Sequence, residues 1–205
     1  MELIQTKYED VRPMMQTGDI IGFSSNGIFG KGIRWFTKSP INHVAIVLHN
    51  DGDNLMLIIE ALDRIRINRL SARIKEKGTL NVWYLPLAKE LRDVIDTKGV
   101  VDYLLNRDLQ SYDWSAIGAF VRRAIFKQIA WEEKEKEDKS FCSELATLSL
   151  RDGGKLHGKF DDRFPHNATT ISPENLTQMN LFADTYYQIG GKDFTPLPGY
   201  NGSQK

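Results

Sequence analysis

The sequence predicts an α+β fold with a central antiparallel sheet. Short apolar runs are typical of strands, and two of them flank Asp51 and Gly52, a pair that favours a tight hairpin. Apolar residues at positions 141, 145 and 148 predict a helix packed against that sheet. The chain has 205 residues, 41% of them hydrophobic, which is enough for one core. Residues 1–205 are therefore expected to form a single domain.

The first expected strand is short and apolar. Thr17, Gly18 and Asp19 have the composition of a turn, and residues 20–23 follow as a strand, so the core is expected to begin near residue 17. Residues 24–38 contain three glycines among large apolar side chains and predict a loop that leads into a short helix lining a cleft. A nucleotide-binding loop is excluded because the spacing and the lysine of a P-loop are missing.

The hairpin carries two candidate site residues, His43 and Glu60. A two-residue type I′ turn would place Asn50 opposite Asp53 and His43 opposite Glu60. Side chains directly opposite in a sheet are close enough for a carboxylate to orient an imidazole. A carboxylate in an apolar strand is costly to bury alone, so Glu60 either serves a polar site or faces solvent at the strand end. For His43, the alternative is a structural histidine.

The remaining elements are interpreted as scaffold. Alternating apolar residues predict strands at 65–70, 80–87 and 185–189. Helical periodicity and capping residues predict helices at 71–77, 88–106, 115–131 and 172–176. The basic run at 71–77 is expected to be a solvated face. The helix at 115–131 either packs on the core or lies at a lipid surface with its basic side outward.

The boundaries follow from the same patterns. The core is expected over about 17–190, with a helical, charged insert at about 114–139 and a flexible tail at 199–205.

Cys142 is the only cysteine, and its expected place is the first turn of the helix predicted around positions 141–148. Free backbone N–H groups and the helix dipole stabilise an anion there, so they lower a thiol pKa and can also hold an oxyanion. The alternative is a small buried hydrophobic residue. One cysteine excludes an intrachain disulfide and a multi-thiolate zinc site, and the four histidines lack ligand spacing. No metal and no cofactor are therefore expected.

The overall charge argues against nucleic acid as a partner. Lys plus Arg and Asp plus Glu number 27 each, so no global basic field is present. The first fifteen residues lack the apolar run of a signal peptide, and no segment is long and apolar enough to span a bilayer. A cytoplasmic location is expected.

Five short stretches together resemble the circularly permuted NlpC-like branch of papain-fold cysteine enzymes, near the bacterial YiiX-like proteins and more distantly the lecithin:retinol acyltransferases. They are Gly18-Asp19-Ile20-Ile21, Asn42-His43-Val44-Ala45-Ile46-Val47, Glu60-Ala61, Tyr112-Asp113 and Phe141-Cys142-Ser143-Glu144-Leu145. In that branch the histidine strand comes early and the cysteine helix late, as in this chain. The resemblance implies a permuted papain-like (NlpC-like) fold.

The resemblance also implies roles for individual residues. Cys142 corresponds to the nucleophile, His43 to the base and Glu60 to the third polar residue, with Tyr112 near the site. Ser143 and Asn42 join Tyr112 as candidate substrate-binding or oxyanion residues.

These roles predict a cysteine hydrolase or acyltransferase that cleaves an amide or ester through a thioester. The implied substrates are a peptide, a peptidoglycan fragment or a lipid acyl group. The alternative function is a papain-like binding module in which the same residues are not used for catalysis, at a lipid surface or elsewhere.

Overall fold

The computed structural model describes residues 1–25, 39–50, 55–61, 65–76, 79–106, 142–168 and 171–202, which form an α+β structure. Its strands are β1 (Glu2–Gln5), β2 (Ile20–Ser25), β3 (His43–Asn50), β4 (Leu55–Ala61), β5 (Ile65–Arg69), β6 (Thr79–Leu85) and β7 (Thr185–Gly190). Its helices are α1 (Tyr8–Val11), α3 (Leu70–Ile74), α4 (Lys89–Arg92), α5 (Thr97–Leu105), α7 (Cys142–Leu148) and α8 (Pro173–Gln178). Short 3-10 or π turns lie at Arg12–Met14, Ser149–Gly153, Asp161–Arg163 and Tyr200–Gly202.

The strands form one mixed sheet in the order β1-β7-β6-β2-β3-β4-β5. Every neighbouring pair from β7 to β5 is antiparallel, as predicted, but β1 pairs with β7 in parallel. The sequence did not predict β1, because three of its four residues are exposed and it has no alternating apolar pattern. The strands predicted near residues 20, 65, 80 and 185 are all present.

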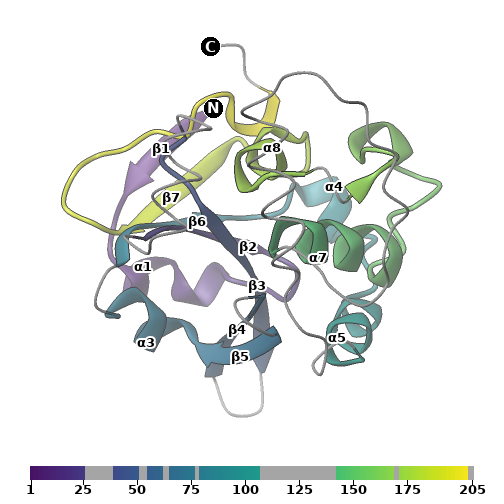
Figure 1. The fold of residues 1–205 in the computed structure, drawn as a ribbon, viewed down its shortest axis with the longest axis horizontal. Helices are drawn as coiled ribbons and strands as arrows, with labels where there is room; N and C mark the ends of the chain where they lie inside the picture. The colour runs from purple at the N-terminus through teal and green to yellow at the C-terminus, as the bar shows by residue number, and fades with distance from the viewer. Residues whose placement is uncertain are drawn as a thin grey trace, which may run out of the picture.

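Helices cover both faces of the sheet (Figure 1). In the view shown, α5, α7 and α8 lie on one side and α1 and α3 on the other. Alternate residues of each strand point to opposite faces. Val44 and Trp83 therefore pack in the core under α7, whereas Ala45 and Tyr84 pack in a second core under α1 and α3.

The β3–β4 hairpin differs from its predicted register. Asn50 pairs with Leu55 rather than Asp53, and Ile46 pairs with Ile59. The predicted two-residue turn is therefore wrong, since four residues separate the last pair. Residues 51–54 themselves lie outside the described part of the chain. The change is two positions, so each side chain stays on its predicted face of the sheet.

Two further expectations need correction. The helix predicted at 88–106 is divided into α4 and α5, because the Asp96 side chain accepts a hydrogen bond from the Gly99 N–H at 2.8 Å and caps a new helix. Two residues of the tail expected to be flexible from residue 199, Tyr200 and Asn201, are buried. Tyr200 is buried and stacks on Tyr186 with ring centroids 4.0 Å apart.

Several sequence-based expectations concern segments outside the described residues. They are residues 26–38 of the loop predicted at 24–38, whose first two residues belong to β2, and the insert at 114–139 with its helix at 115–131.

Candidate functional site

His43 lies at the end of β3 where β3 is no longer paired with β4. His43 is the first residue of β3 and pairs with Phe23 of β2, but the ladder to β4 begins only at Ile46 and Ile59. The first residues of β3 and the last residues of β4 thus lie beyond that ladder. Helix α7 packs against β3 and also contacts β4 (Figure 1).

His43 and Glu60 are in direct contact. The distance between His43 Nε2 and Glu60 Oε2 is 2.7 Å, and the two side chains are 11% and 0% exposed. The predicted direct cross-strand pairing is wrong, because the register is shifted by two positions and the β3–β4 ladder ends at Ile46 and Ile59, before it reaches either residue. A shift of two leaves both side chains on one face, where diagonal neighbours with long side chains still reach each other.

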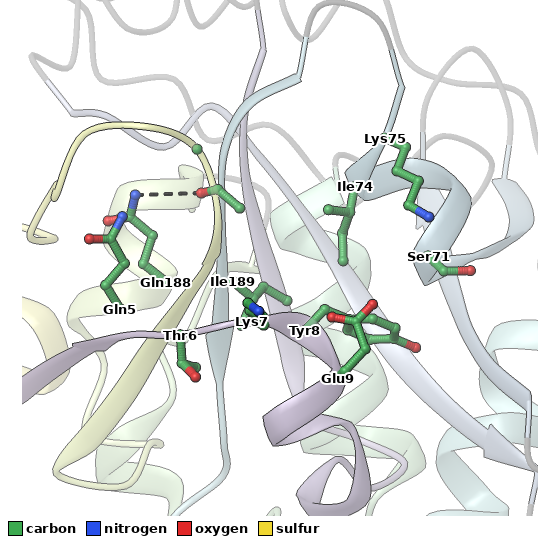
Figure 2. A pocket seen from close by; sticks show the side chains of 12 residues that line it. Gln5, Thr6, Lys7, Tyr8, Glu9, Ser71, Ile74, Lys75, Gln188 and Ile189 are labelled. Carbon is green, nitrogen blue, oxygen red and sulfur yellow. Dashed lines mark hydrogen bonds between the residues drawn. The ribbon is translucent and has the colours of Figure 1, made fainter.

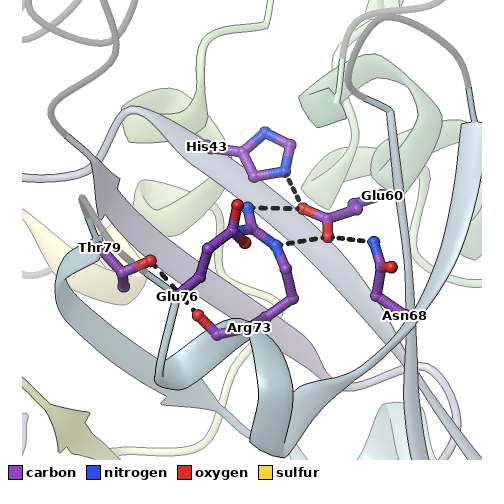
Figure 3. A network of polar contacts seen from close by, with 6 residues as sticks. All are labelled: His43, Glu60, Asn68, Arg73, Glu76 and Thr79. Atoms are coloured by element: carbon purple, nitrogen blue, oxygen red, sulfur yellow. Dashed lines mark hydrogen bonds and ion pairs between the residues drawn. The ribbon is translucent and has the colours of Figure 1, made fainter.

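Two further residues hold the Glu60 carboxylate (Figure 3). Arg73 donates from Nε to Oε1 at 2.7 Å and from Nη2 to Oε2 at 3.1 Å. Asn68 donates from Nδ2 to Oε1 at 2.8 Å. Both carboxylate oxygens therefore accept two hydrogen bonds each when the His43 contact is included, and the group is fixed in its plane.

These partners keep Glu60 charged. Burial alone would raise the pKa of this carboxyl group, but hydrogen bonds and opposite charges at His43 and Arg73 outweigh it and lower the pKa from 4.5 to about 2. Glu60 is thus a buried carboxylate at neutral pH.

Cys142 is the first residue of α7 and is 6% exposed. Burial alone would raise the pKa of its thiol. The charge of His43, a hydrogen bond with the His43 ring, and backbone N–H donors at Val44 and Ser143 outweigh burial, so the thiol pKa lies below its ordinary value. With Nε2 on Glu60, Nδ1 is the ring nitrogen left for the sulfur.

His43 shows the reciprocal effect. Burial alone would lower the pKa of the ring, but the charge of Cys142 and hydrogen bonds to Cys142 and Glu60 raise it from 6.5 to about 9. The charge of each group thus favours the charged form of the other, so the environment shifts the pair toward thiolate and imidazolium.

The other candidate residues are placed as follows. The Ser143 hydroxyl donates to the Ile171 carbonyl at 2.5 Å, so it is already used within the core. Asn42 is buried beside His43, and its backbone N–H donates to the Phe23 carbonyl. Tyr112 lies outside the described residues.

Sequence reasoning missed Arg73 and Asn68. Arg73 belongs to the basic run expected to be a solvated face, yet its side chain is only 13% exposed. Only the two-residue period of a strand pointed to Asn68 as a partner of Glu60, and that indication was weak. Arg66 lies opposite Glu60 in the β4–β5 register, and Asn68 follows Arg66 by two positions. Asn68 therefore lies on the same face of the sheet as Glu60.

A pocket of about 250 Å³ lies elsewhere, between the start of α1, α3 and the end of β7 (Figure 2). Lys7, Tyr8, Ser71 and Lys75 are among the residues that line it. None of His43, Glu60 and Cys142 contributes to it, so this pocket is separate from the polar cluster.

Within the described residues, no group of three or more His, Cys, Asp or Glu side chains is arranged to hold a metal ion. Among the helices that those residues form, none has the length and apolar character needed to cross a membrane.

Comparison with known proteins identifies the fold. No family model and no curated protein matches the chain. A solved structure, that of metalloprotein YiiX from Escherichia coli O157:H7 (DUF1105), matches with a TM-score of 0.56 and 16% sequence identity. The match covers 86% of this chain and 97% of that one. At this identity the likeness extends to the fold alone, which is YiiX-like.

Proposed function

We propose that this protein is a cysteine hydrolase or acyltransferase of permuted papain-like (NlpC-like) type that cleaves an amide or ester bond. One observation carries the proposal: His43 bonds the buried Glu60 carboxylate through Nε2 and also interacts with the Cys142 thiol, whose pKa is lowered. A nucleophile, a base and a group that orients the base are the parts of a catalytic triad. The early histidine and late cysteine match the order in the permuted branch.

In the proposed reaction, the Cys142 thiolate attacks the carbonyl carbon of the substrate. The imidazolium of His43 then donates its proton to the leaving amine or alcohol as the tetrahedral intermediate collapses to a thioester. Water or another acceptor, deprotonated by His43, attacks the thioester and releases Cys142. Glu60 fixes the ring orientation and stabilises its charged form throughout.

The substrate class follows from the same proposal. Peptides, cell-wall peptide fragments and lipid acyl groups all present a carbonyl that a thiolate attacks. A thioester is formed in each case, so hydrolysis and acyl transfer differ only in the acceptor.

Thiol labelling tests the nucleophile directly, because the chain has one cysteine and any label on a thiol is on Cys142. We expect iodoacetamide to modify the parent protein rapidly at pH 7 and His43→Ala much more slowly. His157→Ala is the matched control, since the His157 ring is 68% exposed and pairs only with Asp161 in the described structure. Equal rates for the parent and His43→Ala would refute an activated thiol.

Turnover of a model ester and a model amide tests catalysis. Cys142→Ala should abolish turnover, and His43→Ala should lower kcat/KM by about 10² to 10⁴-fold. Glu60→Gln should cost less, because the third member of a triad is the most replaceable. Rapid labelling without turnover of any ester or amide would instead support a binding module that retains the cluster.

A further inference from the structure

The contact between Arg73 and Glu60 has the geometry of a clamp. Arg73 binds both carboxylate oxygens through two different nitrogens, at 2.7 and 3.1 Å (Figure 3). Paired hydrogen bonds between a planar guanidinium and a carboxylate fix orientation as well as distance. A lysine ammonium in the same place would supply the charge but not the two N–H donors held in one plane, which we call the fork.

Arg73 is itself held in position. Its guanidinium lies over the Phe23 ring at 5.1 Å from the centroid, and the Phe23 ring lies 5.9 Å from that of His43. Arg73 also forms an ion pair with Glu76. Arg73 is 13% exposed, so its charge is only partly screened by water.

Among the residues that the structure describes, charged groups around His43 come from several elements. Cys142 approaches from α7, Glu60 from β4 and Arg73 from α3. Arg66 of β5 lies opposite Glu60 in the β4–β5 register. His43 Nε2 and Arg73 Nη2 bond the same oxygen, Glu60 Oε2, so the two cations share one anion.

We infer that Arg73 is a positioning residue of this site: it holds the Glu60 carboxylate toward His43 and shares its negative charge. The inference rests on the proposed function. An unshared carboxylate would bind the imidazolium more strongly, and a ring that holds its proton too tightly is a poor acid and base near neutral pH. A carboxylate bonded only by Asn68 and His43 would also be freer to rotate.

The test compares Arg73→Gln and Arg73→Lys with the parent chain. The readouts are the pKa of His43, followed by NMR of its ring protons, and kcat on the model ester. In Arg73→Gln the His43 pKa should rise by about one unit, because a nearby positive charge is lost. In Arg73→Lys it should stay near the parent value, while kcat falls in both variants because neither side chain forms the fork.

Arg92→Gln is the matched control. Arg92 bonds Asp19 at 2.6 Å, and that carboxylate is 0% exposed, like Glu60. Arg92→Gln should lower the thermal midpoint without changing the His43 pKa. An unchanged His43 pKa in folded Arg73→Gln would overturn the positioning role, and so would full kcat in Arg73→Lys.

The proposed function and this inference fail in different ways. Absence of turnover in the parent chain would remove the function itself. Turnover in the parent, with Arg73→Gln and Arg73→Lys behaving like the parent in both readouts, would remove the role of Arg73 only.

Discussion

Glu60 is a fully buried carboxylate that is hydrogen-bonded to three side chains, Asn68, His43 and Arg73, of which the last two can carry a positive charge. Its lowered pKa makes the free energy of unfolding depend on pH. A carboxyl group with a folded pKa of about 2, against 4.5 ordinarily, stabilises the fold at any pH above 4.5. That stabilisation is lost as the pH falls from 4.5 through 2.

Glu60→Gln should accordingly destabilise the protein in a pH-dependent way. The shift corresponds to a few kcal/mol, on the order of 3 kcal/mol at pH 6, since one pKa unit is about 1.4 kcal/mol. Urea unfolding of the parent and the variant from pH 7 to pH 2.5 measures the difference, which should shrink below pH 4.5. Glu90→Gln is the control, because Glu90 pairs with Arg163 at the surface. A difference that is constant with pH would contradict the assignment.

At the scale of elements, α5 and the π turn after α7 approach so closely that only glycine fits at their contact. A Cβ on Gly99 would lie 2.1 Å from the Gly153 carbonyl oxygen, and a Cβ on Gly153 would lie 2.7 Å from Tyr103 Cβ. Neither obstacle is the flexible end of a side chain. The position of α5 therefore depends on two small residues that are 54 positions apart in the sequence.

Gly99→Ala should force α5 away from the turn. Alanine favours a helix by about 1 kcal/mol over glycine, so a local effect alone would stabilise. We expect the opposite, a fall in the thermal midpoint of several degrees, because overpacking costs about 1–3 kcal/mol. Lys98→Ala in the same helix is the control, since Lys98 is 83% exposed. An increased midpoint for Gly99→Ala would show that the contact yields easily.

For the whole molecule, Asp19, which directly precedes β2, connects the chain before that strand to the neighbouring strand β6 and to α4. Its side chain is 0% exposed and accepts four hydrogen bonds, at 2.6 to 3.0 Å, from Gln16 N, Tyr84 Oη, Leu87 N and Arg92 Nη2. The N-terminal turn, β6 and α4 are thereby joined through one carboxylate.

Asp19→Asn should destabilise the entire fold. An amide presents an N–H₂ group to donors that need an acceptor, and Arg92 loses its charged partner, so we expect a loss of about 3 kcal/mol or more. Chemical unfolding measures it, with Asp93→Asn as the control because Asp93 pairs with Lys89 at the surface. A loss as small as that of the control would show that Asp19 is not the connection between these elements.

Local sequence patterns determined most of the sheet and the Cys142 helix. Apolar runs and turn residues located β2 to β7, and helical spacing located α7. The two-residue period of a strand also decided that His43 and Glu60 share a face, because an error of two in the register does not change it. The parts of the candidate site that depend on strand or helix periodicity could thus be predicted from the sequence.

Only the tertiary structure decided the remainder. The hairpin register, the parallel pairing of β1, the closure of Tyr200 onto Tyr186 and the clamp of Arg73 on Glu60 all join residues that local patterns treat separately. A basic run is solvated in most proteins, and Arg73 is an exception because a buried carboxylate lies within its reach. Secondary structure follows from the spacing of neighbouring side chains, whereas the partner of a buried charge depends on which distant side chains the folded chain brings to it.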